Sequence, residues 1–206
     1  MAGRTIAFEG LDGCGKTTQL QLVKAWLAEQ DPDGEHVFLR EPGGTTFGEA
    51  VRELLLTGDG MGSRAETLLY MASRAELYET LIGPALQRGA LVVMDRSYYS
   101  TAAYQGAGLE LGVDAVLDMA RWVTGGRAPD RVVLLRLSPE QALARRTAAG
   151  GGEDRIEARE AEYFERVGQA YDALAAREPE RFVVIDASAA VERVAADVAE
   201  VLRGLV

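Results

Sequence analysis

Residues 9–19 read EGLDGCGKTTQ and directly follow the short apolar run 6–8, Ile-Ala-Phe. Within this stretch, residues 10–17 fit the pattern G-x-x-x-x-G-K-[ST]. Glycine lets a phosphate chain approach the backbone closely, and the N–H groups at the start of a following helix carry partial positive charge. The stretch therefore predicts a phosphate-binding loop between a strand and a helix, with an ordinary glycine-rich turn as the alternative.

The motif also predicts roles for single loop residues. Lys16 is expected to bridge the β- and γ-phosphates of a nucleoside triphosphate, and the Thr17 hydroxyl is expected to hold Mg²⁺. Cys14 is interpreted as a small residue that fills the loop, although a helix N-terminus can also lower the pKa of a thiol and make it reactive. The loop thus predicts a nucleotide site that uses a metal ion.

Composition limits the classes of protein and ligand. The 206 residues are 48% hydrophobic and 26% charged, which predicts a single domain with a sizeable core. The net charge of -10 argues against binding to a nucleic acid polymer, so any phosphate must be held locally. One cysteine and one histidine, His36, exclude an internal disulfide and a Cys/His zinc site. No apolar run is long enough to cross a membrane, and we expect a cytoplasmic protein.

Arginine dominates the basic residues. Lys16 and Lys24 are the only lysines, so arginine supplies the other 20 of the 22 basic side chains, and asparagine is absent. We favour genome composition over thermal adaptation as the explanation, because arginine bias alone is a weak signal of thermophily.

Short apolar runs alternate with helical patterns along the chain. Leu20, Val23 and Leu27 recur at helical spacing, and a second helical pattern covers 65–88. Apolar runs of this length suit strands that are covered on both faces. We therefore predict an α/β fold with a five-stranded parallel sheet and helices on both faces. The expected strands are 5–8, 36–39, 91–94, 132–135 and 182–185.

The third expected strand ends in Asp95 and Arg96. In such a sheet, ligands bind beyond the carboxyl ends of the strands. A carboxylate at that edge can hold Mg²⁺ directly or through water, and an adjacent arginine can neutralise charge on a transferring phosphoryl group. An ordinary ion pair at a strand end is the alternative.

The second expected strand runs into REPGGT at 40–45, a rigid turn where a second substrate would lie. Together with EGLDGCGKTT at 9–18, DRSYYSTAAYQG at 95–106 and DRIE at 154–157, this motif makes the chain resemble the thymidylate kinases. The resemblance implies a P-loop NTPase fold and transfer of the γ-phosphoryl group of ATP to dTMP, which gives dTDP and ADP for dTTP biosynthesis. It also implies Mg²⁺ as cofactor and a homodimer.

Site residues follow from the resemblance by position. Arg96 and Arg52 would clamp the acceptor phosphate, because a guanidinium matches phosphate geometry. Tyr70 would stack on thymine and Arg74, four residues later on the same helix face, would reach the carbonyl edge of the base. Phenylalanine is frequent in the family where Tyr70 stands. The alternatives are a solvated surface charge for Arg52 and a buried core residue for Tyr70.

Further acceptor residues follow in the same way. Thr101 matches a position that contacts the base, and Tyr104 matches a ring that crowds the ribose 2′-carbon. Asp12 would face the sugar 3′-hydroxyl or the metal shell, unless it only bonds its own backbone. The residues expected to bind dTMP are Asp12, Glu41, Pro42, Arg52, Tyr70, Arg74, Arg96, Ser100, Thr101, Tyr104 and Gln105. The residues expected to bind ATP are Gly10, Leu11, Asp12, Gly13, Cys14, Gly15, Lys16, Thr17 and Thr18. The residues expected to hold the metal are Thr17 and Asp95.

Residues 143–157 should form a short mobile lid over ATP, with the glycines at 150–152 as a hinge. Relatives without an arginine in the phosphate loop often carry lid arginines that reach the transferring group. Here these are Arg145, Arg146 and Arg155, which are expected to be catalytic together with Lys16 and Arg96; a solvated lid charge is the alternative for each. Arg136, inside the fourth apolar run, has no explanation from the sequence.

Three other functions compete with this interpretation. A regulatory GTPase normally reads guanine through N-K-x-D, which a chain without asparagine lacks. A non-catalytic ATP-binding protein or an ATPase would give Arg52, Tyr70 and Arg74 no common purpose. A kinase of the same fold for another monophosphate or for a nucleoside stays open and is separated by a panel of substrates. The expected partners are the nucleotides and a second copy of the chain, with neither nucleic acid nor membrane.

Overall fold

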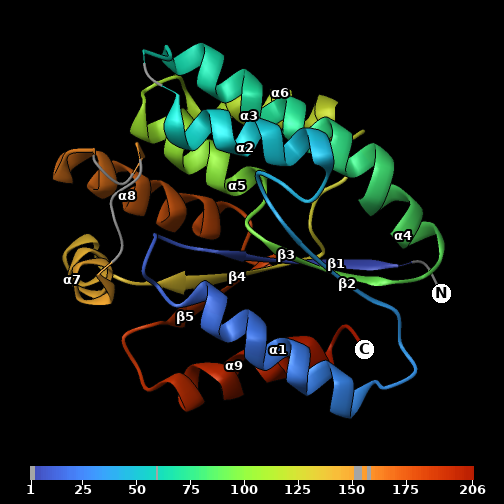
Figure 1. Cartoon of the computed structure of the whole chain (residues 1–206). Helices are drawn as coiled ribbons and strands as arrows, with labels where there is room; N and C mark the ends of the chain where they lie inside the picture. The colour runs from blue at the N-terminus through green and yellow to red at the C-terminus, as the bar shows by residue number, and fades with distance from the viewer. Residues whose placement is uncertain (1–2, 59, 151–154, 157–158) are drawn as a thin grey trace.

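The computed structural model describes residues 3–58, 60–150, 155–156 and 159–206. A five-stranded sheet with the strand order β2-β3-β1-β4-β5 forms its centre, and every neighbouring pair of strands is parallel. The predicted five parallel strands are therefore confirmed (Figure 1). The strands are β1 (Arg4–Glu9), β2 (His36–Arg40), β3 (Leu91–Asp95), β4 (Arg131–Arg136) and β5 (Phe182–Asp186).

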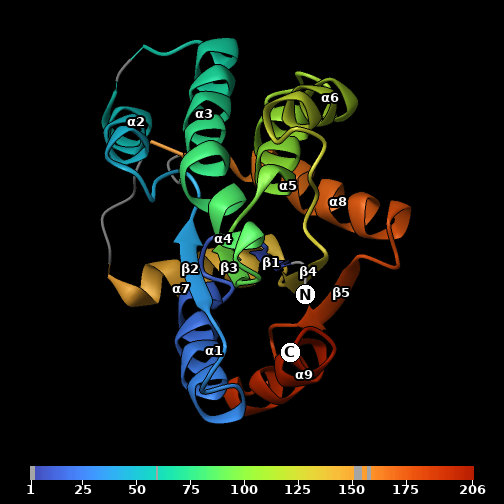
Figure 2. The same cartoon turned by 90° about the vertical axis from the view of Figure 1, so that its right-hand side faces the viewer.

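Helices cover both faces of the sheet. In Figures 1 and 2, α1 and α9 lie beneath it, and α2, α3, α4, α5, α6 and α8 lie above it. The helix predicted over 65–88 is a nearly continuous run in which α3, a π-helical turn (Tyr78–Ile82) and α4 follow one another. The helices are α1 (Lys16–Gln30), α2 (Thr46–Thr57), α3 (Ser63–Leu77), α4 (Gly83–Gln87), α5 (Tyr98–Thr101), α6 (Val113–Val123), α7 (Pro139–Ala149), α8 (Ala161–Arg177) and α9 (Val191–Arg203), and a second π-helical segment is η2 (Ala102–Gly108).

The three inner strands form the core. Residues 6–8 of β1 and 92–94 of β3 are fully shielded from solvent, and so is most of the apolar run in β4. Both faces of these strands pack against helices, which explains their unbroken apolar sequence. The edge strand β5 differs from the expectation of burial on both faces, because Val184 at its centre is exposed.

Backbone hydrogen bonds draw together the loops that follow β1, β2 and β3. The N–H of Arg96, just after β3, donates to the carbonyl of Phe8 in β1 at 2.9 Å. The N–H of Glu41, just after β2, donates to the carbonyl of Asp95 at 2.9 Å. Parallel strands end at the same edge of a sheet, so the residues that follow them converge on one site.

Candidate active site

The loop after β1 adopts a conformation that glycine permits. Gly10 and Gly13 have φ angles of 137° and 87°, in the region that other residues rarely adopt. A Cβ atom at Gly10 would lie 2.5 Å from the carbonyl oxygen of Leu135, and one at Gly13 would lie 2.7 Å from that of Ala142. Both glycines are therefore required for this loop to pass so close to its neighbours.

Lys16 is the first residue of α1, and its side chain turns back into the loop. Its Nζ donates hydrogen bonds to the carbonyl oxygens of Gly10 and Leu11, at 3.0 Å each. The first N–H groups of a helix have no partner within the helix, so α1 directs them at the same place as the ammonium group. The loop thus combines a fixed positive charge with backbone donors, as a phosphate chain requires.

Asp95 ends β3 beside this loop. Its Oδ1 atom is buried and accepts no hydrogen bond from the described residues. A buried carboxylate oxygen without a donor suits a cation or the water bound to one. Among those residues no cluster of three or more acidic, histidine or cysteine ligands exists. Mg²⁺ at phosphoryl-transfer sites takes most of its ligands from phosphate and water, so Asp95 and the exposed Thr17 fit such an ion.

Arg96 connects the phosphate loop with the residues after β3. Its guanidinium donates to the carbonyl of Gly10 at 3.1 Å, to Oδ1 of Asp12 at 2.6 Å and to Oγ of Ser100 at 2.8 Å. It also lies 5.0 Å from the centre of the Tyr104 ring. The backbone of Arg96 has a φ angle of 71°, which costs free energy in a non-glycine residue. These contacts hold the strained residue in place.

Asp12 accepts hydrogen bonds from two side chains, Arg96 and Tyr104. Burial alone would raise the pKa of Asp12, but the charges of Arg96 and Lys16 outweigh it and hold that pKa well below its ordinary value. Asp12 is therefore ionised at neutral pH. Its side chain thus bonds to side chains from two other segments. The alternative interpretation, that Asp12 only bonds its own backbone, does not describe this structure.

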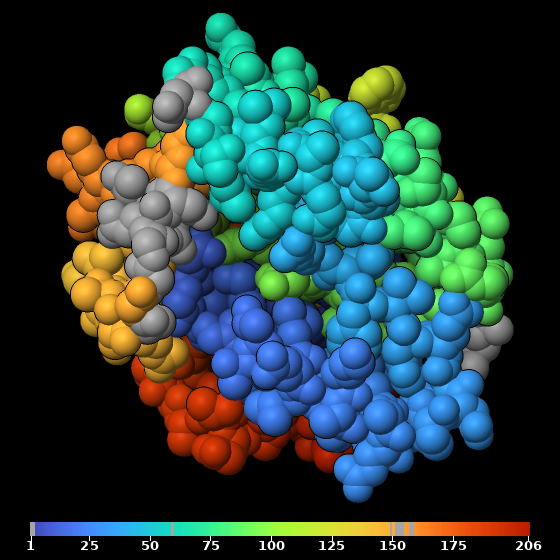
Figure 3. Space-filling model, viewed as in Figure 1, coloured from blue at the N-terminus to red at the C-terminus, as the bar shows by residue number. Residues whose placement is uncertain are grey.

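A pocket of about 90 Å³ lies beside this ion pair. The surface is hollowed here, between the blue residues of the phosphate loop and α1 and the cyan residues of α2 (Figure 3). The structure brings together at this pocket all eleven residues that the sequence predicts for dTMP binding. The lining residues are Asp12, Glu41, Pro42, Arg52, Leu56, Tyr70, Arg74, Arg96, Ser97, Ser100, Thr101, Tyr104, Gln105 and Ile156. We call this space the acceptor pocket.

Arg74 is almost fully buried in the wall of the acceptor pocket. Its Nε donates to Glu41 at 2.6 Å, and a terminal nitrogen donates to Oγ1 of Thr101 at 2.9 Å. Burial raises the pKa of Glu41, and the nearby Arg74 offsets only part of this effect. Arg74 thus has a fixed orientation before any ligand binds.

Tyr70 and Arg52 line the same pocket. Burial raises the pKa of Tyr70 to about 12, so its hydroxyl stays neutral. Within the part of the chain that the structure describes, Arg52 donates one hydrogen bond, to the carbonyl of Pro42 at 3.2 Å. Most of its guanidinium hydrogens thus remain for another acceptor, as a phosphate clamp requires.

Comparison with known proteins gives the family. The family model described as thymidylate kinase matches residues 8–198. The chain belongs to the thymidylate kinase family. It is 47% identical over 199 residues to the thymidylate kinase of Clavibacter sepedonicus, covering 96% of this chain and 93% of that one. It is 45% identical over 194 residues to the thymidylate kinase of an Exiguobacterium species, covering 93% and 90%.

A solved thymidylate kinase, from Ehrlichia chaffeensis, has the same fold, with a TM-score of 0.81 and 30% identity. The match covers 98% of this chain and 99% of that one. The predicted P-loop NTPase fold is therefore confirmed. As a thymidylate kinase, the chain is an enzyme that phosphorylates dTMP, with ATP as the phosphoryl donor. Within the described ranges, the thymidylate kinase chain has no helix long and apolar enough to span a membrane.

The three candidate lid arginines of this thymidylate kinase lie in different places. Arg146 is nearest the phosphate loop, since its Cγ is 3.0 Å from where a Cβ atom on Gly13 would stand. Arg145 donates to the carbonyl of Ala187 after β5, at 2.8 Å. Arg155 instead donates a hydrogen bond to Leu55 of α2 and forms an ion pair with Glu66 of α3, on the side of the acceptor pocket. The first part of the predicted lid, 143–149, belongs to α7, while 151–154 and 157 lie outside the described residues.

Sequence reasoning missed Glu9, which is fully buried at the end of β1. Its carboxylate accepts hydrogen bonds from the hydroxyls of Ser97 at 2.7 Å, Ser100 at 2.5 Å and Tyr171 at 2.8 Å. It thereby fixes the start of α5, which carries Ser100 and Thr101 of the acceptor pocket. A charged residue that ends a buried strand, inside the opening stretch itself, was the available signal.

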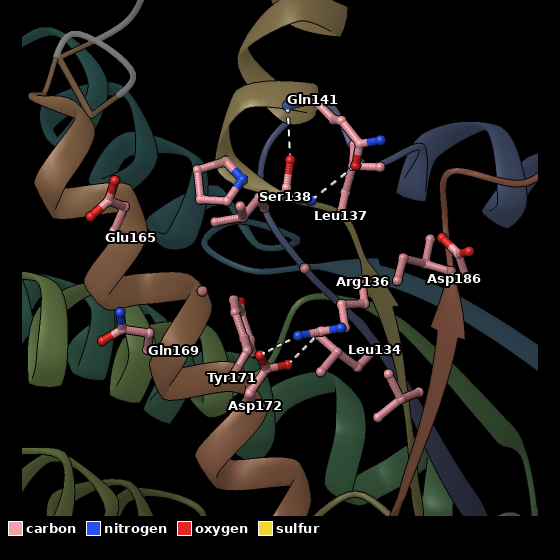
Figure 4. Close-up of a pocket in the computed structure, with 16 residues that line it drawn as sticks. Leu134, Arg136, Leu137, Ser138, Gln141, Glu165, Gln169, Tyr171, Asp172 and Asp186 are labelled. Carbon is pink, nitrogen blue, oxygen red and sulfur yellow. Dashed lines mark hydrogen bonds and ion pairs between the residues drawn. The ribbon is translucent and has the colours of Figure 1, made fainter.

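The structure explains Arg136. It lies exposed at the end of β4 and pairs with Asp172 of α8 through two hydrogen bonds of 2.8 and 2.7 Å (Figure 4). Both residues line a cavity of about 610 Å³ between α8 and the strands β4 and β5. This cavity meets the phosphate loop only through Gly10 and Leu11. Arg136 therefore lies beside this cavity, at the end of β4, and does not line the acceptor pocket.

Proposed function

We propose that ATP binds on the phosphate loop and dTMP binds in the acceptor pocket, so that the γ-phosphoryl group passes between them to give dTDP and ADP. The observation that carries this arrangement is Arg96, which bonds both to the loop carbonyl of Gly10 and to Asp12 and Ser100 of the acceptor pocket. One guanidinium thus joins the two sites where the group must be transferred.

The donor side supplies charge and orientation. Lys16 leaves the carbonyl groups of Gly10 and Leu11 and bridges the β- and γ-phosphates, while the N–H groups of the loop hold the phosphate chain. Thr17 and Asp95 would hold Mg²⁺, which would neutralise phosphate charge. Because phosphoryl transfer needs little covalent help from protein, alignment and positive charge supply most of the catalysis.

The acceptor side orients dTMP. Arg52 and Arg96 clamp its phosphate, which places an acceptor oxygen in line with the γ-phosphate. Tyr70 stacks on the base, and Arg74 and Thr101 read the base edge. Tyr104 crowds the ribose 2′-carbon, and Asp12 faces the 3′-hydroxyl. Support comes from the convergence of these side chains on one pocket.

The chain acts as a single domain, and residues 143–157 act as its lid. Arg146 is our first choice for the lid arginine that reaches the transferring group, because it lies beside Gly13 of the loop. Arg145 is a further candidate for that role, whereas Arg155, which was expected to share it, is held against α2 and α3 on the acceptor side. Closure over ATP would exclude water and so limit hydrolysis of ATP.

A homodimer in the cytoplasm is the form we propose for the working enzyme. Large apolar side chains are exposed on the helices above the sheet, Leu54 on α2, Leu68 on α3 and Trp122 on α6, which is 83% exposed. Such exposure suits an interface with a second copy. Cys14 is a free thiol, as in most cytoplasmic proteins. Light scattering on the wild type and on Leu68→Glu tests the dimer, since a charge on this exposed apolar surface should give monomers.

Release of ADP in a coupled assay tests the proposed function. Separate wells contain Mg-ATP with dTMP, dUMP, UMP, dCMP, dGMP, AMP or no acceptor. We expect the highest turnover with dTMP and almost none without an acceptor. Higher turnover with another monophosphate would identify a kinase of the same fold with a different acceptor, and equal ADP release in every well would identify an ATPase.

A further inference from the structure

Glu66 is a buried carboxylate that no motif singled out. It lies on α3 and is 1% exposed. Its Oε1 accepts a hydrogen bond from Gln105 of the acceptor pocket at 2.8 Å. Its Oε2 is 2.6 Å from a guanidinium nitrogen of Arg159 and 2.8 Å from one of Arg155. A single carboxylate thus holds one pocket residue and two arginines that are more than 80 positions further along the chain.

The two arginines are each held at a second point. Arg155 donates through Nε to the carbonyl of Leu55 in α2 at 3.0 Å. Arg159 donates to the hydroxyl of Tyr163 at 2.6 Å and lies 4.6 Å from the centre of that ring. Their positions are therefore fixed by α2 and α3 on one side and by α8 on the other.

Ile156 lies between these anchors and is buried in the wall of the acceptor pocket. The other lining residues belong to the segments between 12 and 105. This wall therefore comes from a distant part of the chain, and the contacts of Arg155 and Arg159 hold it against α3.

Tyr163, which contacts Arg159, also packs against Tyr104. The two rings meet edge to face with 6.3 Å between their centres. Tyr163 also packs closely on the π-helical segment that contains Tyr104, because a Cβ atom on Gly108 would lie only 2.4 Å from the Tyr163 ring. A movement of Arg159 would therefore displace Tyr163 and, through it, the Tyr104 ring that lines the acceptor pocket.

We propose that Glu66 is a positioning residue for the acceptor nucleotide: by holding Arg155 and Arg159, it seats Ile156 and Tyr104 against dTMP. This inference rests on the proposed function and deepens it. It gives Arg155 an anchoring role on the acceptor side. Glu66 itself touches neither the reacting atoms nor the donor site, so its loss should affect binding of dTMP and not binding of ATP.

Steady-state kinetics of Glu66→Gln provide the test. The substitution keeps the shape of the side chain but removes the charge that holds both arginines. We expect the KM for dTMP to rise about tenfold, as for the loss of one hydrogen bond to a charged group, while the KM for ATP changes less than about twofold. dTMP should also stabilise the fold of Glu66→Gln less than that of the wild type, which is measured as a smaller rise in Tm on adding dTMP. The shift that ATP produces should persist.

Substitutions at two other positions, Arg159 and Ile156, keep the test decisive if Glu66→Gln does not fold. Arg159→Lys retains the charge and should raise the KM for dTMP less than Arg159→Gln does. Ile156→Ala removes the apolar wall and leaves every ion pair intact, and it should raise the KM for dTMP alone. The control is Arg177→Gln, which breaks the exposed ion pair with Asp114 on the outside of α8 and should leave both KM values unchanged.

The outcomes separate the inference from the proposed function. If the folded variants leave the KM for dTMP unchanged, or raise both KM values equally, the positioning role of Glu66 is wrong. If the wild type does not turn over dTMP in the same assay, the proposed function itself fails.

Discussion

Arg96 and Asp12 form an ion pair of 2.6 Å between the loop after β3 and the loop after β1. Both side chains also contact Tyr104, which lies in η2. Three segments that are distant in the sequence therefore meet at one charged cluster, beside the carbonyl of Gly10. In the proposed arrangement, this cluster is where the donor and acceptor sites meet.

The ionisation of Asp12 should make the free energy of unfolding depend on pH. Because its pKa in the folded chain is below the ordinary value of 3.8, the ionised form stabilises the fold. That contribution is fully present above about pH 4 and is lost as the pH falls below the ordinary value. Urea unfolding of the wild type and Asp12→Asn should thus differ at pH 7 and converge at lower pH. A constant difference across that range would contradict the assignment.

Lys16→Ala should lose at least roughly 10²-fold in turnover with its fold intact, on the scale of removing one preorganised charge donor. Lys24→Ala is the matched control, since Lys24 is the only other lysine and lies on the same helix, over the ring of Phe38. Turnover with dTMP and circular dichroism check the two variants together. A folded Lys16→Ala protein with near-normal turnover would remove the phosphate-loop assignment.

Asp95→Asn should require more Mg²⁺. The substitution keeps the size of the side chain but weakens its interaction with a cation or with water bound to one. We expect the Mg²⁺ concentration for half-maximal turnover to rise about 10–100-fold, as for groups that support a metal. Titration with Mg²⁺ at saturating ATP and dTMP measures this. Chelation of Mg²⁺ should abolish turnover of the wild type, and an unchanged titration curve for Asp95→Asn would exclude the role.

Arg74→Met should destabilise the fold, because Glu41 would be left buried without its charged partner. Breaking a buried pair in this way costs about 3–5 kcal/mol, whereas removing both charges costs less. The double variant Glu41→Gln with Arg74→Met should therefore recover part of the loss. Denaturant unfolding of the two single variants and the double variant gives the coupling. Strictly additive losses would show that the pair is not coupled.

Tyr104 should exclude ribonucleotides by its ring. Tyr104→Phe keeps the ring and should retain most of the preference for dUMP over UMP, although it loses the hydroxyl that bonds to Asp12 at 3.0 Å. Tyr104→Ala opens the space beside the ribose and should lose that preference. The ratio of kcat/KM for dUMP and UMP measures the effect. An unchanged preference for dUMP in Tyr104→Ala would contradict this role of the ring.

Local patterns explain what could be predicted from the sequence. The phosphate loop was predictable because its motif reflects one turn of backbone between a strand and a helix. The buried strands were predictable because both faces pack on helices. The acceptor residues came from the resemblance to a family, and the structure brings them to one pocket.

Contacts between distant residues could not be predicted in the same way. Arg136 pairs with Asp172, 36 positions later, and nothing near Arg136 in the sequence indicates this. Glu66 looks like one polar position in a helix until the chain folds Arg155 and Arg159 onto it. The turns that widen to π-helix at Tyr78–Ile82 and Ala102–Gly108 likewise follow no local signal that we recognise.

The left-handed backbone of Arg96 has a consequence for attempts to engineer this protein. Glycine would adopt that conformation without strain, but Arg96→Gly would also leave the partly buried Asp12 without its guanidinium partner, so relief of the backbone would not make the variant more stable. Such a variant would lose the one guanidinium that joins both halves of the reaction centre. Stability and turnover should thus depend on the same side chain at this position, so a screen that scores only survival on heating should also retain the arginine.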